Sequence, residues 1–223
     1  MGIKVYWGSG SPFAWRVLLA LEFKGLAYES RRLFFDKREH KSPEYLKLNP
    51  RGQVPALTDG EFALYESLAI LAYLDRKYPE KPLFGRTPEE HGTVMQWVSE
   101  IGSYVEPSGL PIPQTAFFSE WNDAAKATVG QAVERIVPEM ERIEERLASA
   151  PWLAGGACSA ADLCLYPLLE IFWRASMLLE KKGGHPSLAR IARSGFPAIE
   201  RWCGEISRLP GYERTYPPHW RQP

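Results

Sequence analysis

Apolar residues in the first third of the chain alternate between strand spacing and helix spacing. Ile3, Val5 and Trp7 occupy every second position, as on one face of a strand, and the apolar residues from Val17 to Leu26 recur at helical spacing. The pattern further predicts an extended segment over residues 27–35, a helical turn over 42–48, strands over 54–58 and 62–64, and a helix over 66–77. The resulting order, βαβαββα, is that of a thioredoxin-like α/β domain.

After a segment rich in proline and glycine at residues 79–86, strand patterns nearly vanish. Apolar residues from Val129 to Leu147 step by three and four, which predicts an amphipathic helix with a kink at Pro138. Residues 163–173 are apolar on nearly every side and predict a central helix. We therefore expect a thioredoxin-like domain over 1–78, a linker over 79–86 and an all-helical domain over 87–223.

Ser159 and Asp162 have the spacing of a helix capping box at the start of that central helix. Each side chain can reach the backbone N–H of the other, and losing such a cap typically costs about 0.5–2 kcal/mol. We assign both residues to folding rather than to chemistry.

The balance of charged residues argues against nucleic acid and anionic membranes as partners. The chain of 223 residues has 27 Lys and Arg against 27 Asp and Glu, so no field of one sign recruits nucleic acid or an anionic membrane. The amino terminus has no signal-peptide pattern, and Cys158, Cys164 and Cys203 fit buried thiols of a reducing cytoplasm. The four histidines lack metal-ligand spacing, so we expect surface histidines and no metal site.

Three motifs in order carry a family resemblance: Ser-Pro-Phe-x-x-Arg-Val at residues 11–17, Asn-Pro-Arg-Gly-Gln-Val-Pro-Ala-Leu at 49–57, and Glu-Ser at 66–67. With them the chain resembles the soluble glutathione transferases over nearly its whole length. The first motif looks like the serine-type classes, such as tau and zeta. The resemblance implies a cytoplasmic homodimer that uses glutathione as co-substrate, and a cis peptide bond before Pro55.

Ser11 is the expected catalytic residue. The glutathione thiol has a pKa of about 8.5, and lowering it by about two units requires roughly 2.7 kcal/mol. A hydrogen bond to the thiolate supplies about 1.5–3 kcal/mol and a helix N-terminus about 0.3–1 kcal/mol, and Ser11 before Pro12 can provide both. By itself a Ser-Pro pair is as often a plain helix cap. Ser9 is a rival hydroxyl, and Tyr6 a weaker one because it falls within the first predicted strand.

The resemblance also assigns the groups that bind glutathione. A cis Val54–Pro55 bond would turn the backbone of Val54 toward the cysteinyl residue of the peptide. Glu66 would bind the γ-glutamyl ammonium and Ser67, at a helix start, its carboxylate, although a first-turn acid and cap explain the same pair without function. Gln53 and Lys41, or its neighbour His40, would bind the glycine carboxylate.

We expect the electrophile pocket to be lined by Phe13 and by Tyr104 on the first helix of the second domain. Pro107, Pro111 and Pro113 would interrupt that helix and reshape the cleft. The aromatic stretch over residues 212–220 could fold over it. For each of these aromatic residues, ordinary packing is the simpler interpretation.

These residues predict conjugation of glutathione to small hydrophobic electrophiles. Because no cysteine precedes residue 158, no protein thiol can form a mixed disulfide with glutathione at this site. Ser-Pro-Phe also replaces the Ser-Ser-Cys run of the zeta class, which counts against that class's isomerase activity. Two alternatives stay open: a glutathione-dependent isomerase or dehalogenase, and a noncatalytic binding module with the same fold.

Overall fold

The computed structural model describes residues 2–221, which form two compact units. One unit contains the residues up to Phe84 together with those from Ser207 onward, and the other runs from Gly85 to Ile206. The sequence pattern placed residues 207–223 in the helical domain, whereas the structure groups this last segment with the first unit.

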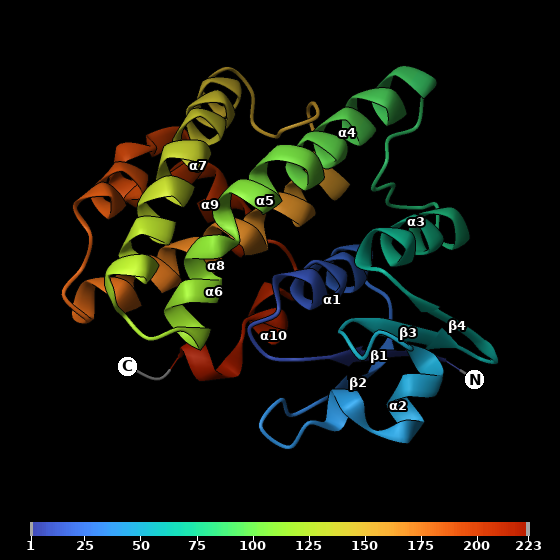
Figure 1. Cartoon of the computed structure of the whole chain (residues 1–223). Coiled ribbons are helices and arrows are strands. Elements are labelled where there is room, and N and C mark those ends of the chain that lie inside the picture. Colours follow the sequence, from blue (N-terminus) through green and yellow to red (C-terminus); the bar gives the residue numbers. More distant parts are fainter. Residues whose placement is uncertain (1, 222–223) are drawn as a thin grey trace. The chain divides into compact units, whose positions relative to one another are not determined.

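A four-stranded mixed sheet forms the centre of the first unit, in the order β2-β1-β3-β4 (Figure 1). Strand β1 pairs in parallel with β2 and antiparallel with β3, and the Asp59–Gly60 pair leads from β3 into β4. The predicted order of elements is confirmed. The strands are β1 (Ile3–Trp7), β2 (Tyr28–Arg32), β3 (Ala56–Asp59) and β4 (Phe62–Tyr65).

Helices cover both faces of this sheet. Figure 1 shows α1 (Pro12–Lys24) and α3 (Ser67–Lys77) on one face and α2 (Pro43–Leu48) on the other. Helix α1 is buried along most of its length, since Val17 and Leu21 are fully inaccessible, as is Leu71 on α3. This is the thioredoxin-like arrangement expected from the sequence.

The last segment of the chain returns to α1 through α10 (Tyr212–Thr215) and a 3-10 turn, Pro218–Trp220. Nε1 of the buried Trp15 donates a hydrogen bond to Oγ1 of Thr215 at 2.9 Å. The rings of Tyr216 and Trp220 meet the Trp15 ring edge-on, at centroid distances of 5.6 and 5.5 Å. A buried indole needs an acceptor for its N–H as well as apolar neighbours, and this segment supplies both.

The second unit is helical within the described residues 85–206. The prolines were expected to interrupt the first helix of this unit, but the backbone stays helical through most of this region. A π-helical turn, Ile101–Val105, follows α4 directly, and Leu110 alone separates α5 from α6. Pro107 and Pro111 lie in the first turns of these two short helices. Helix α7 continues through Pro138, where a kink was expected, without interruption of its helical assignment. The helices are α4 (Pro88–Glu100), α5 (Glu106–Gly109), α6 (Pro111–Phe118), α7 (Asp123–Ser149), α8 (Ala160–Lys181) and α9 (Pro197–Ser207).

Helix α8 is the predicted central helix, and it begins with the predicted capping box. Asp162 is fully buried and accepts hydrogen bonds from the backbone N–H of Ser159 at 2.9 Å and of Leu153 at 3.0 Å. Nε1 of Trp202 on α9 donates to the same carboxylate at 2.9 Å. Asp162 thus joins a helix start, a loop and a neighbouring helix.

Along residues 2–221, the length and apolarity of each helix fall short of what crossing a membrane requires.

Candidate functional site

The first unit contains a pocket of about 420 Å³. It lies where the β1–α1 loop, the segment before α2, the segment before β3 and the start of α3 come together. The residues that line it are Ser11, Phe13, Phe35, His40, Lys41, Asn49, Gly52, Gln53, Val54, Pro55, Glu66 and Ser67. The structure therefore brings together in one pocket every residue that the sequence assigned to glutathione, together with Ser11 and Phe13.

Ser11 is the N-cap of α1 and lines the pocket. Its Oγ accepts a hydrogen bond from the backbone N–H of Ala14 at 3.3 Å, so the cap anticipated from the Ser-Pro pair is present. This bond uses a lone pair of the hydroxyl and leaves its proton available to donate. Capping and donation to an anion in the pocket are therefore compatible roles for one side chain.

The two other candidate hydroxyls lie outside the set of lining residues. Oγ of Ser9 is 2.6 Å from Nδ1 of His219 in the last segment of the chain. Tyr6 lies within β1, and its ring contacts that of Tyr45 at a centroid distance of 6.0 Å. Of the three hydroxyls that the sequence offered, Ser11 is the one at the pocket.

The segment before β3 is held firmly by hydrogen bonds. The carbonyl of Gln53 accepts from the Tyr45 hydroxyl at 2.5 Å and from Nδ2 of Asn49 at 2.7 Å. The Val54–Pro55 peptide bond is cis, as the resemblance implied. Pairing between β1 and β3 begins one residue later, at Ala56, so Val54 lies beside the pocket and outside this ladder.

Glu66 has an unusual backbone conformation immediately before α3. Its φ of 70° and ψ of 113° are rare for a residue with a side chain, and such conformations cost about 1–3 kcal/mol and concentrate at functional sites. The carboxylate is exposed and lies 3.8 Å from Nε of Arg51. Ser67, which is buried, begins the helix, and backbone N–H groups at a helix start favour anions.

His40 was expected to be a surface histidine, and the structure corrects this expectation because the half-buried His40 lines the pocket. Its Nδ1 is buried and has no hydrogen-bond partner among the described residues. Burial lowers the pKa of His40, and the charges of Lys41 and Arg38 lower it further. Nζ of Lys41 donates to the carbonyl of Arg51 at 3.2 Å. The sequence had pointed to His40 only as the neighbour of Lys41, the residue expected to bind the glycine carboxylate.

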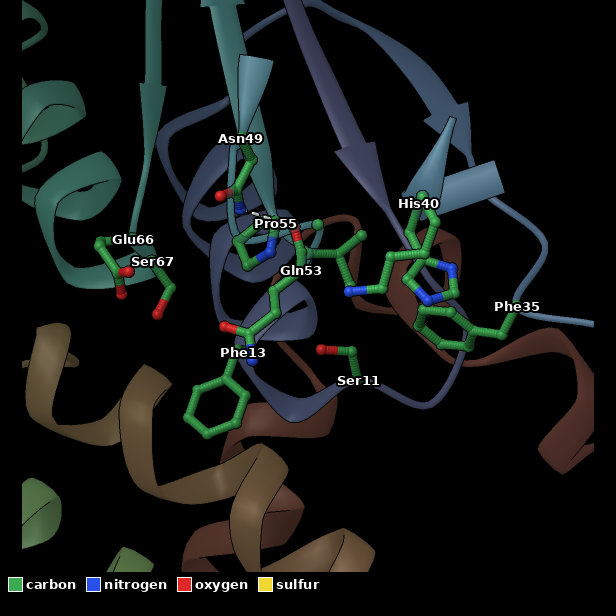
Figure 2. Close-up of a pocket in the computed structure, with 12 residues that line it drawn as sticks. Ser11, Phe13, Phe35, His40, Asn49, Gln53, Pro55, Glu66 and Ser67 are labelled. Atoms are coloured by element: carbon green, nitrogen blue, oxygen red, sulfur yellow. Dashed lines mark hydrogen bonds between the residues drawn. The ribbon is translucent and has the colours of Figure 1, made fainter. Parts of the chain in front are cut away.

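Phe35, Asn49 and Gly52 also line the pocket; Asn49 and Gly52 belong to the motif at residues 49–57 but were given no role there, and Phe35 was not singled out. The ring of Phe35 meets that of His40 edge-on, at a centroid distance of 5.1 Å. Figure 2 shows Glu66 and Ser67 on one side of the group, His40 and Phe35 on the other, and the side chains of Ser11 and Gln53 between them. The order across the pocket is an acid with a helix start, then the Ser11 hydroxyl, then His40.

The proposed electrophile contacts are only partly visible in this pocket. Phe13 lines it, with the Arg16 guanidinium 4.9 Å from the centre of its ring. Tyr104 belongs to the helical unit and is 54% exposed, so its role stays a prediction. The 212–220 segment packs on α1 and contacts Ser9, and contributes no lining residue to this pocket. Within the described part of the chain, no three His, Cys, Asp or Glu side chains are grouped as metal ligands.

Comparison with known proteins agrees with this geometry. Residues 1–76 match the family "Glutathione S-transferase, N-terminal domain" and residues 116–205 match "Glutathione S-transferase, C-terminal domain". The chain is 34% identical over 170 residues to glutathione S-transferase 4 of Zea mays, covering 75% of this chain and 76% of that protein. It is 29% identical over 225 residues to glutathione S-transferase F9 of Arabidopsis thaliana, covering 96% of each.

The solved structures include a glutathione S-transferase I bound with lactoylglutathione. Its TM-score is 0.78 at 28% identity, and the match covers 96% of this chain and 98% of that one. Several of the curated relatives are plant F-class, or phi, enzymes, so the expected likeness to the tau and zeta classes was wrong. A short Ser-Pro run does not separate these classes, because Ser-Pro is also a common way to begin any helix. The chain belongs to the glutathione S-transferase family.

Proposed function

We propose that this protein conjugates glutathione to small hydrophobic electrophiles by substitution or addition, and that Ser11 stabilises the reacting thiolate. One observation carries the proposal. A hydroxyl at a helix start lies between an acid with a second helix start on one side of the pocket and His40 on the other, and Lys41 also lines this pocket. That order matches the groups of the tripeptide, which are ammonium and carboxylate, thiol, and carboxylate.

In the proposed complex, Glu66 binds the γ-glutamyl ammonium, and Ser67 with the start of α3 binds the neighbouring carboxylate. The Val54 backbone pairs with the cysteinyl residue in the manner of an added strand. Lys41 and Gln53 bind the glycine carboxylate. His40 joins them, because its buried Nδ1 lacks a partner within the described residues and it is next to Lys41.

The thiol then lies near Ser11. A free thiol with a pKa of about 8.5 is only a few per cent ionised at pH 7. A hydrogen bond from the Ser11 hydroxyl and the dipole of the 13-residue helix α1 together supply about 2–4 kcal/mol in favour of the anion. This amount suffices to lower the pKa by about two units. The thiolate attacks the electrophile directly, without a covalent intermediate on the protein, and Phe13 is the proposed contact to the electrophile.

Titration of the bound thiol tests this mechanism. The ultraviolet absorbance of the thiolate is followed against pH in the complex, and we expect a pKa about two units below that of free glutathione. An unchanged pKa in the complex would reject the role of Ser11.

A panel of electrophiles with products identified by mass separates conjugation, which adds the tripeptide, from isomerisation or dehalogenation. Retention on immobilised glutathione without turnover of any electrophile would favour a binding module.

We also propose a homodimer, as is typical of this family. The exposed apolar side chains of Phe62 on β4 and Leu68 on α3 are the proposed contacts to a second copy. Sedimentation of the wild type and of Phe62→Lys tests this assembly. Cys158, Cys164 and Cys203 are buried, which suits the cytoplasm as the proposed location.

A further inference from the structure

The loop that carries Ser11 is a tight turn. The backbone N–H of Ser11 donates to the carbonyl of Gly8 at 3.2 Å, which closes a four-residue turn over residues 8–11. Two of these four residues are glycine, and Gly10 has a φ of 86°. Glycine permits this conformation but also leaves the free loop with more conformational freedom than any other residue would. The position of the Ser11 hydroxyl therefore depends on what holds the turn from outside.

Two aromatic side chains from distant parts of the chain lie against the turn. A Cβ added to Gly8 would be 2.1 Å from Cζ of Phe35, so the Phe35 ring lies directly on this glycine. A Cβ added to Gly10 would be 3.1 Å from Cε1 of His219. The same histidine is joined to the turn by the 2.6 Å hydrogen bond between its Nδ1 and Oγ of Ser9. Phe35 thus contacts Gly8, and His219 contacts Gly10.

His219 is itself held in place relative to α1. The segment before it is fastened by the hydrogen bond between Trp15 and Thr215 and by the ion pair between Arg214 and the buried carboxylate of Glu22. Trp220, the next residue, packs edge-on against Trp15. Because Trp15 and Glu22 belong to α1, the helix that Ser11 caps, the end of the chain ties the turn to its own helix.

We propose that His219 is a positioning residue for Ser11. It holds Ser9 and Gly10 so that the Ser11 hydroxyl keeps one direction into the pocket. His219 lies outside the set of pocket-lining residues and acts through the turn, without touching glutathione. The proposal rests on the proposed role of Ser11 and adds a contribution from the carboxy-terminal segment to thiolate stabilisation.

Three variants test the proposal. His219→Ala removes the anchor, His219→Asn keeps a hydrogen-bonding group near the place of Nδ1, and Arg221→Ala is the matched control. Arg221 belongs to the same segment, and its guanidinium donates to the carbonyl and the carboxylate of Glu213 and lies over the ring of Tyr216. We expect His219→Ala to lower kcat roughly five- to tenfold and to raise the pKa of the bound thiol, because a misplaced hydroxyl loses its alignment with the thiolate. The KM for glutathione should stay within about twofold.

His219→Asn should recover most of the lost kcat, and Arg221→Ala should resemble the wild type. Equal losses in His219→Ala and Arg221→Ala would overturn the proposal, because the segment would then act only through general stability. A wild-type kcat and thiol pKa in His219→Ala would overturn it as well. Thermal unfolding of each variant shows whether it is folded under the conditions of the kinetic assay.

Hydrogen exchange of the Gly10 and Ser11 amides gives a readout that does not need glutathione. We expect faster exchange at these two amides in His219→Ala than in the wild type, and no such change in Arg221→Ala. Unchanged exchange would overturn the anchoring step. If the wild type neither binds nor uses glutathione, the proposed function fails on that measurement, while the exchange experiment still decides whether His219 holds the turn.

Discussion

Among the helices that begin at a serine, α1 in the first unit and α8 in the second have serines with different surroundings. At the start of α8, Ser159 is 6% exposed, and both its backbone N–H and its hydroxyl donate to Asp162 at 2.9 Å. At the start of α1, the half-buried Ser11 accepts one N–H at 3.3 Å and lines a pocket. The same local signal thus serves folding where the hydroxyl proton is used within the protein, and suits chemistry where that proton remains available.

The residue three positions after the serine explains the difference. Asp162 follows Ser159 and gives the hydroxyl an acceptor, whereas Ala14 follows Ser11 and offers only its backbone N–H. A carboxylate at that place in α1 would occupy the Ser11 proton and repel a thiolate. An unsatisfied donor beside a pocket is therefore the informative feature, more than the serine itself.

The largest effect is expected at the folding site. Asp162→Ala leaves the N–H groups of Leu153 and Ser159 and the Trp202 indole without their acceptor, and it should lower the free energy of unfolding by roughly 3–5 kcal/mol. Asp162→Asn, which keeps one carbonyl acceptor, should lose less. Urea unfolding measures both, and a loss under about 1 kcal/mol in Asp162→Ala would contradict the assignment to folding.

The chemical site should respond in rate more than in stability. Ser11→Ala removes a donor that acts on the charged thiolate, so kcat should fall by roughly 10- to 100-fold while the KM for glutathione changes little. Loss of the cap should lower the free energy of unfolding by about 1 kcal/mol or less. Steady-state kinetics at several pH values measure the first effect, and wild-type turnover in Ser11→Ala would reject the catalytic role.

Ser159→Ala makes the comparison direct, because the same substitution is made at the other helix start. We expect a loss of about 1 kcal/mol in the free energy of unfolding, the usual value for a cap, and a kcat within about twofold of the wild type. If both alanine variants lowered kcat alike, the distinction drawn between the two serines would be lost.

The smallest effect concerns acid stability of the first unit. Hydrogen bonds from Lys77, at 2.5 Å, and from Tyr73 hold the pKa of Asp59 below its ordinary value. A lowered folded-state pKa stabilises the protein above the unfolded-state value of about 3.9, and this contribution disappears as the pH falls through the folded-state pKa. Asp59→Asn should therefore be less stable than the wild type at pH 7, and the difference should shrink by pH 3. Urea midpoints at the two pH values provide the measurement, and a constant difference would contradict this cause.

The sequence was enough to predict the succession of elements in the first unit and, through the family resemblance, most of the residues that gather at the pocket. Alternating and helical spacings indicated the sheet and helices, because burying one face imposes a period on the sequence. The cap at Ser159 and the cis bond before Pro55 were likewise expected, the first from spacing and the second from the family motif. The class assignment failed, because the Ser-Pro run at residue 11 reports a helix start more than a class.

Tertiary structure alone decided which hydroxyl faces the pocket, that His40 lines it, and that the residues after 206 return to the first unit. Each of these outcomes depends on contacts between residues far apart in the sequence, such as Ser9 with His219 and Trp15 with Thr215. Periodicity records only which face of an element is buried, and so it says nothing about which partner covers that face. Local pattern therefore determined the elements, and long-range packing determined which of their polar groups remain free to act.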